Sequence, residues 1–179
     1  MMFEQFRFKA FALQNTAVLS LFSNGITTGL VAESGEGCTY TVPVFEGYAL
    51  PHALHHIDVA GVDITNKLIS ELKETYPDTV EDKHFHNIRD VKEKMCHVAR
   101  NYQAEMERRD DDLTEEERSY ELPGGEIIEV NQRKRITAAE AMFDPTIVGV
   151  RHPEYDACQG GIAQLAYRSI EKCDSDLKI

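Results

Sequence analysis

Residues 33–37 read ESGEG and join two runs of apolar and β-branched residues. In a glycine-rich turn that follows a strand, consecutive backbone N–H groups can point into one concavity and bind phosphate oxygens. Glycine suits such a turn because a Cβ would block the ligand and because some turn positions need a positive φ. The carboxylates of Glu33 and Glu36 would repel bare phosphate, so the loop suits a magnesium nucleotide better. A plain hairpin loop is the commoner alternative and stays open on spacing alone.

Three histidines form a second candidate site. His52, His55 and His56 stand at i, i+3 and i+4, and would share one face if residues 49–56 were helical, where imidazoles can bind a metal ion. The sequence offers no obvious cysteine or carboxylate to complete the site. Packed or solvent-facing histidines are therefore the preferred interpretation, and a histidine metal module is kept as a third hypothesis.

Other reactive side chains carry less information. The serines have no GxSxG context, so a nucleophilic triad is only a background possibility. The cysteines are far apart and form no CxxC pair, which argues against zinc and favours small buried apolar residues in a reducing compartment. They are Cys38, Cys96, Cys158 and Cys173.

Composition limits the function classes. The 179 residues include 19 basic and 31 acidic side chains, a net charge of −12, and the length predicts one domain or two small subdomains. Because a negative field repels phosphodiester backbones, and because Arg133-Lys134-Arg135 is too short to outweigh it, we expect no direct nucleic-acid binding. No apolar run approaches the roughly 20 residues of a membrane-spanning helix, and the N-terminus lacks a secretory layout. We therefore expect an intracellular protein without a membrane partner.

Hydrophobic periodicity predicts the elements around the loop. The runs 26–32 and 39–45 predict the two strands of a hairpin, with ESGEG between them. Residues 10–22 predict a buried helix that ends at Asn24-Gly25. Residues 63–76 and 86–99 carry apolar side chains at helical spacing and predict two amphipathic helices.

The second half of the chain adds further elements. Residues 105–118 are almost all charged and predict a solvated loop, whereas 120–130 predicts two short strands around Pro123-Gly124-Gly125. Thr137 and Glu140 form a capping-box pattern that predicts a helix start, and Gly160-Gly161 precedes a final helix. Helices and strands are mixed, so the class is α/β or α+β.

Several ordered blocks of this sequence resemble actin and the actin-related proteins, in order and over nearly the whole chain. The blocks are AVLSLFSNGITTGLVAESGEGCTYTVPVFEGYALPHAL, IDVAGVDIT, IRDVKEKMCHVA, SYELPGGEIIEV and SIEKCDSDLKI. The resemblance implies an α/β, actin-like ATPase (ribonuclease H-like) fold, here one partial lobe with an inserted α/β subdomain. It also implies three parts: a hinge helix and remnant of the first lobe (1–24), a third-subdomain-like part (25–59 and 149–179) and a fourth-subdomain-like insertion (60–148).

The resemblance implies ATP or ADP with Mg as the cofactor. ESGEG is similar to the second phosphate hairpin loop of actins, DSGDG, and the family's adenosine contacts fall on the VAGVD and RDVKEK segments. The implied cofactor-binding residues are Ser34, Gly35, Glu36, Gly37, Gly61, Arg89, Lys92 and Glu93.

Three positions depart from the family's catalytic pattern. Thr16 stands where the family has a water-positioning glutamine, with Gln14 two residues earlier. Glu33 replaces the aspartate that organises the magnesium waters, and is the implied metal position, through water. Tyr40 replaces the histidine near the attacking water, and a phenol with a pKa of roughly 10 is a poor proton acceptor at neutral pH. Because a displacement of about 1 Å can cost about 100-fold in rate, we expect slow or absent hydrolysis. Val62 also replaces an arginine beside the cleft.

Two functional hypotheses follow from the resemblance. The resemblance implies that the chain begins about a third of the way into a typical actin and stops before the loop that closes over the adenine. The first hypothesis is an actin-like structural protein, a non-catalytic or weakly catalytic subunit of a cytoskeletal or larger assembly. Its partners would be actin-like subunits or other proteins, in the cytoplasm or cytoskeleton, or in a nuclear or axonemal complex. The alternative is a fragment of an active ATP-hydrolysing filament subunit.

Overall fold

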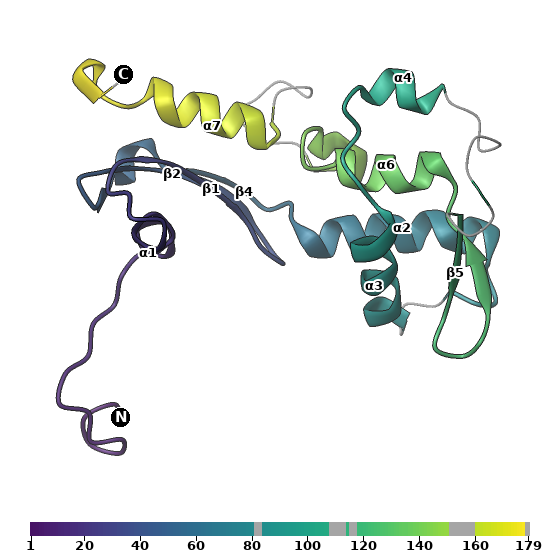
Figure 1. Ribbon diagram of the computed structural model, residues 1–179, viewed down its shortest axis with the longest axis horizontal. Helices are drawn as coiled ribbons and strands as arrows, with labels where there is room; N and C mark the ends of the chain where they lie inside the picture. The colour runs from purple at the N-terminus through teal and green to yellow at the C-terminus, as the bar shows by residue number, and fades with distance from the viewer. Residues whose placement is uncertain (81–83, 108–113, 115–117, 151–159, 178–179) are drawn as a thin grey trace. The chain divides into compact units, whose positions relative to one another are not determined.

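The computed structural model describes residues 1–80, 84–107, 114, 118–150 and 160–177 (Figure 1). The chain divides into two compact units, each described below by itself. Unit 1 contains Met1–Glu33, Thr41–His55 and Ala166–Ile179, and unit 2 contains Ser34–Tyr40 and His56–Leu165. Within the described ranges, no helix is both long and apolar enough to span a bilayer. The three-part division given above stays a prediction.

A small sheet runs through the first part of the chain. Its strands are β1 (Gly29–Ser34), β2 (Thr39–Phe45), β3 (Tyr48–Ala49) and β4 (His55–Ile57). Strand β2 pairs with β1, with β3 and with β4, and its side chains are almost all buried, as a central strand requires. Because only four residues separate β1 from β2, the two form an antiparallel hairpin. The predicted hairpin is confirmed, although β1 begins at Gly29 and not at residue 26.

Helix α1 (Thr16–Ser23) is shorter than predicted. The side chain of Asn15 accepts a hydrogen bond from Ala17 N at 2.9 Å and caps the helix, so residues 10–15 lie outside it. Only Ala17 and Val18 of this helix are buried. The prediction of a buried helix over residues 10–22 is therefore wrong in its start and in its burial.

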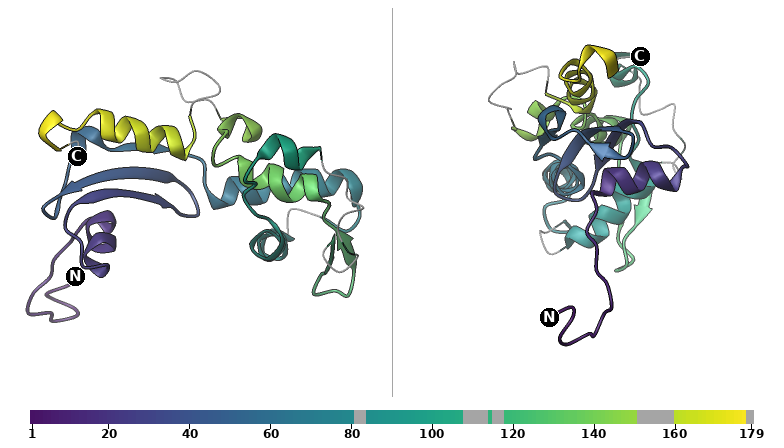
Figure 2. Two further views of the ribbon diagram at one scale, coloured as in Figure 1. Left: turned by 45° about the horizontal axis from the view of Figure 1, so that its top comes forward. Right: turned by 90° about the vertical axis from the view of Figure 1, so that its left-hand side faces the viewer.

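A buried polar cluster joins the sheet of unit 1 to the C-terminal half of α7 (Ile162–Glu171). The Oγ1 atom of Thr41 lies 2.6 Å from Oγ of Ser169, and Nδ1 of His55 lies 3.2 Å from the same Ser169 oxygen. Helix α1 and this half of α7 lie on opposite faces of the sheet (Figure 2). The hydroxyls of Thr41 and Ser169 and the Nδ1 atom of His55 therefore have hydrogen-bond partners inside the unit, as buried polar groups require.

The histidines do not share a helix. Pro51–Ala53 forms the short 3-10 turn η1, which contains His52, whereas His55 and His56 lie in β4. A strand directs successive side chains to opposite faces, so His55 is buried and His56 is exposed. Among the described residues, no group of three His, Cys, Asp or Glu side chains could hold a metal ion. The helical ligand spacing on which the metal hypothesis depended is therefore wrong.

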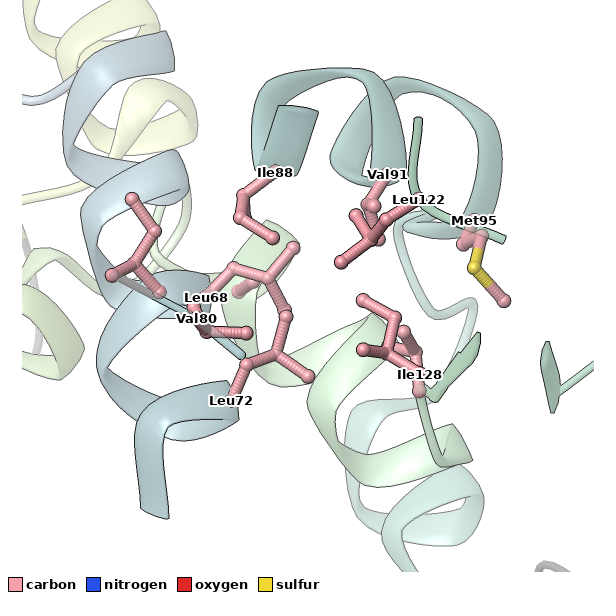
Figure 3. Close-up of a cluster of buried hydrophobic side chains, with 11 residues drawn as sticks. Leu68, Leu72, Val80, Ile88, Val91, Met95, Leu122 and Ile128 are labelled. Carbon is pink, nitrogen blue, oxygen red and sulfur yellow. The ribbon is translucent and has the colours of Figure 1, made fainter. Parts of the chain in front are cut away.

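Unit 2 is built on two amphipathic helices, α2 (Gly61–Thr75) and α3 (Phe85–Met95), and both predicted helices are confirmed. Helix α3 ends earlier than predicted, since Val98 lies beyond it and is 53% exposed. The apolar faces of α2 and α3 meet the hairpin β5 (Ser119–Glu121) and β6 (Ile127–Glu129) in one core (Figure 3). Its fully buried members include Leu68, Leu72, Val80, Ile88, Val91, Ile128 and Val130.

The β5–β6 pairing is antiparallel with Tyr120 opposite Ile128, and its turn contains Gly125 at a positive φ of 84°. Only glycine adopts this conformation at low cost, which explains the turn signal in the sequence.

Part of the predicted charged loop, residues 108–113 and 115–117, lies outside the described residues, as does Cys158. The first two residues of the predicted loop, 105 and 106, instead belong to helix α4 (Tyr102–Met106).

Helix α6 (Gln132–Glu140) begins earlier than its capping-box pattern predicted. Asn131 is the N-cap and accepts from Lys134 N at 2.9 Å, so Thr137 lies inside the helix and the predicted start is wrong. Two members of the basic triplet stabilise this unit: Lys134 Nζ donates to Thr75 Oγ1 at 2.6 Å and Arg135 Nε donates to Met95 O at 2.7 Å. A short 3-10 turn, η4 (Pro145–Val148), follows α6.

Candidate nucleotide site

The loop Gly35–Cys38 joins β1 to β2 and is exposed throughout. Gly35 N donates to Cys38 O at 3.1 Å, whereas the N–H groups of Glu36 and Gly37 have no acceptor within the described parts of the chain. A Cβ on Gly37 would meet nothing within 4 Å. Neither loop glycine has a positive φ, so the expected conformational need for glycine is not found here. The loop offers two backbone donors and open space beside them.

The same loop is bound to the start of α2. Gly61 N donates to Gly35 O at 3.0 Å and Val62 N donates to Glu36 O at 2.8 Å. The first N–H groups of a helix have no partner inside the helix, and here the loop carbonyls supply two of the acceptors. A Cβ on Gly61 would lie 3.2 Å from Gly35 O and 3.3 Å from Glu36 Oε2. Gly61 is therefore a glycine because the loop packs directly against it.

Helix α3 contributes charged side chains to the same place. Lys92 Nζ donates to Gly61 O at 2.9 Å, and Arg89 Nε donates to Glu93 Oε1 at 3.0 Å. The pKa of the Arg89 guanidinium is raised above its ordinary value, first by this hydrogen bond to Glu93 and then by the negative charge of Glu36. Glu36 and Lys92 thus lie next to Gly61, and the Arg89–Glu93 pair lies close enough to Glu36 for their charges to interact. Together they provide positive charge for an anion and acceptors for hydroxyl groups.

Ser34 has two side-chain neighbours that spacing did not predict. The hydroxyl of Thr39, at the start of β2, lies 2.8 Å from Ser34 Oγ and 2.7 Å from the carbonyl oxygen of Val59. Ser34 Oγ in turn donates to the sulfur of Met142 at 3.6 Å. Thr39 is 1% exposed, but β2 is buried along most of its length, so alternation along the strand does not single it out. No local pattern could have identified Met142, which is 108 residues from Ser34.

Two of the three predicted catalytic positions contact each other in unit 1. Thr16 Oγ1 donates to Glu33 Oε2 at 3.1 Å, and Ser20, which the sequence did not single out, donates to Glu33 Oε1 at 2.5 Å. Gln14 lies ahead of α1, where its Oε1 accepts from Asn15 N at 2.9 Å, so the expectation that it lies on that helix is wrong. Tyr40 is half-buried in β2 and belongs to unit 2.

The predicted cofactor residues therefore gather in unit 2. Gly35, Glu36 and Lys92 contact Gly61, and Arg89 with its partner Glu93 is close enough to Glu36 for their charges to interact. Ser34 directly precedes the loop, and a Cβ on Gly37 would meet open space. The mixed helix and strand fold is compatible with an actin-like protein. The family model described as Actin matches residues 1–179, and the chain belongs to the actin family.

Proposed function

We propose that the chain is an actin-like structural protein that binds Mg-ATP or Mg-ADP at the Gly35–Cys38 loop and hydrolyses ATP slowly or not at all. It acts as a subunit of a cytoskeletal or larger protein assembly. The observation that carries this proposal is the convergence of the loop, the start of α2 and the charged face of α3 around Gly61.

The residues present fit a nucleotide in three respects. The N–H groups of Glu36 and Gly37 suit phosphate oxygens, since the described chain gives them no acceptor. Arg89 and Lys92 supply positive charge beside the loop, and the carboxylates of Glu36 and Glu93 suit the hydroxyl groups of a ribose. A bound magnesium ion would neutralise phosphate charge next to Glu36. These residues would hold the nucleotide and orient it.

Weak catalysis is supported by the surroundings of Glu33. Both oxygens of this carboxylate accept hydroxyl hydrogen bonds from α1, from Thr16 and from Ser20. The hydroxyl of Thr16, which stands at the water-positioning place, is thus already hydrogen-bonded, and Gln14 Oε1 accepts from Asn15 N. A carboxylate has further lone pairs for a metal-bound water, so Glu33 keeps its proposed role in magnesium binding.

Assembly with other proteins is supported by the exposed apolar surface of unit 1. Phe3, Phe6, Phe8 and Phe11 are 49–59% exposed, and Leu13 is 86% exposed. Apolar side chains in such number are typical of a surface that a partner covers. We expect the purified chain to be oligomeric in size-exclusion chromatography with light scattering. A monodisperse monomer with one cooperative melting transition would count against this part of the proposal.

Nucleotide binding is tested by titrating the purified chain with a fluorescent ATP analogue in Mg²⁺ and in EDTA. We expect Mg²⁺-dependent binding that the triple variant Glu36→Gln, Arg89→Met, Glu93→Gln weakens by about tenfold or more. Lys67→Met is a matched control, since Lys67 pairs with Glu71 on α2 at 3.2 Å.

Hydrolysis is tested by measuring phosphate release from ATP. Release at an ordinary actin rate would instead favour an active filament subunit. We also expect Thr16→Gln with Glu33→Asp and Tyr40→His to raise turnover.

A further inference from the structure

A buried hydroxyl lies beneath the candidate phosphate loop. Thr39 is 1% exposed, whereas Ser34, at the other end of the loop, is exposed. The Oγ1 atom of Thr39 lies 2.8 Å from Ser34 Oγ and 2.7 Å from Val59 O, and Val59 is itself buried. One side chain thus connects the two ends of the loop with the segment directly ahead of α2.

Thr39 and Ser34 have one hydroxyl proton each, which limits the hydrogen bonds that they can donate at the same time. Thr39 has one proton and two oxygen neighbours, so it donates either to Val59 O or to Ser34 Oγ. If Thr39 donates to Val59 O, which can only accept, Ser34 must donate to Thr39 to keep their 2.8 Å contact; if Thr39 donates to Ser34, it holds the Ser34 oxygen as an acceptor. When Thr39 donates to Ser34, the Ser34 proton points elsewhere, and its acceptor in this structure is the Met142 sulfur at 3.6 Å.

A thioether is a weak acceptor, and a phosphate oxygen is a strong, charged one. In the arrangement in which Thr39 donates to Ser34, the Ser34 proton can therefore leave Met142 for a phosphate oxygen, while the bond from Thr39 holds the Ser34 oxygen in place. We propose that Thr39 is a positioning residue of the phosphate loop, which keeps the Ser34 hydroxyl ready to donate to a nucleotide phosphate. This inference rests on the nucleotide-binding function proposed above.

The test is a double-mutant cycle on the full chain, with binding of the Mg-bound fluorescent ATP analogue as the readout. We expect Thr39→Val to weaken binding about tenfold and Ser34→Ala to do the same, because each removes a charge-assisted hydrogen bond or its support. Thr39→Ser keeps the hydroxyl and should stay within about twofold of the original affinity. In the Ser34→Ala background, Thr39→Val should cost less than about twofold more, since the two residues act together.

Thr41→Val is a matched control for lost stability. Thr41 is another buried threonine of β2, but its hydroxyl contacts Ser169 in unit 1. We expect Thr41→Val and Thr39→Val both to lower the melting temperature, and only Thr39→Val to weaken nucleotide binding. Equal losses of affinity in the two variants, or additive losses in the Ser34→Ala background, would overturn the inference.

Met142 gives a test that does not depend on the folding of Thr39→Val. Met142→Gln places a stronger acceptor near Ser34, and we expect it to weaken binding about fivefold in the original chain but not in Ser34→Ala. Met142→Leu should leave the affinity within about twofold. An equal effect of Met142→Gln in both backgrounds would contradict the inference.

The binding assay also separates the inference from the proposed function. If the unaltered chain fails to bind the Mg-nucleotide, both are refuted. If it binds and Thr39→Val binds equally well, only the inference is refuted.

Discussion

Lys92 and Arg89 lie on one helix and both carry a positive charge, yet the structure assigns them unequal contributions to stability. Lys92 Nζ donates to Gly61 O at 2.9 Å and thereby connects α3 to the start of α2. Arg89 Nε donates to Glu93 Oε1 at 3.0 Å, within the same helix. Replacing each cation by Met removes the charge, keeps most of the aliphatic length and changes helix propensity little.

The expected magnitudes differ several-fold. A hydrogen bond from a charged donor contributes about 1.5–3 kcal/mol, but Gly61 O also accepts from Thr65 Oγ1 at 2.8 Å and would keep this partner. We therefore expect Lys92→Met to lower the free energy of unfolding by about 1–2 kcal/mol. The side chains of Arg89 and Glu93 are 45% and 55% exposed, so solvent screens their ion pair and Arg89→Met should cost much less than Lys92→Met.

The assay is urea unfolding followed by circular dichroism, without nucleotide, at low salt and at about 0.5 M NaCl. Salt screens exposed pairs more than partly buried ones, so the small cost of Arg89→Met should vanish at high salt while most of the cost of Lys92→Met remains. Hydrogen exchange of the first amides of α2 should accelerate only in Lys92→Met. Equal costs for the two variants, or a larger cost for Arg89→Met, would refute this account of the loop and helix contacts.

Three further expectations follow from burial and charge. Burial raises the pKa of the Cys96 thiol to about 11, so only about 1 in 1,000 molecules carries the thiolate at pH 8, and Ellman's reagent should modify exposed Cys38 long before Cys96. A hydrogen bond from Lys94 lowers the pKa of Asp90 below its ordinary value, so its contribution to stability is present above the unfolded pKa and disappears as the pH falls through the folded one. Asp90→Asn should therefore reduce the fall in melting temperature as the pH drops below about 4, the ordinary pKa of an unfolded aspartate, and an unchanged slope would contradict this assignment. Leu68 is fully buried in the core, so Leu68→Ala should cost about 2–5 kcal/mol in urea unfolding, and a cost below 1 kcal/mol would show a loosely packed core.

Elements with long, regular periodicity were predictable from the sequence, and short local signals were less reliable. The spacing of Leu68 and Leu72 placed α2 correctly, since one apolar face of 15 residues leaves few alternatives. The capping-box pattern at Thr137 matched by chance inside a helix that Asn131 already caps. A four-residue pattern carries little information about a helix start, because the cap that forms depends on where the helix packs.

For the candidate site, the residues were predictable but their contacts were not. Glu36, Arg89 and Lys92 were predicted through the family resemblance; Glu36 and Lys92 lie next to Gly61, and Arg89 interacts with the charge of Glu36. Their actual contacts were not predictable, because a link such as Lys92 to Gly61 joins residues 31 positions apart and leaves no periodic signal. The binding role of the cluster stays a prediction until nucleotide is titrated.

The close approach at Gly61 also bears on how this chain can change by mutation. Because a Cβ there would lie 3.3 Å from Glu36 Oε2 and 3.2 Å from Gly35 O, position 61 can lose its glycine only if the loop retreats. A shorter side chain at position 36 removes one of these two contacts. We expect positions 36 and 61 to evolve as a pair, with Gly61→Ala tolerated better in a Glu36→Ser background. Deep mutational scanning of the two positions together would measure this epistasis.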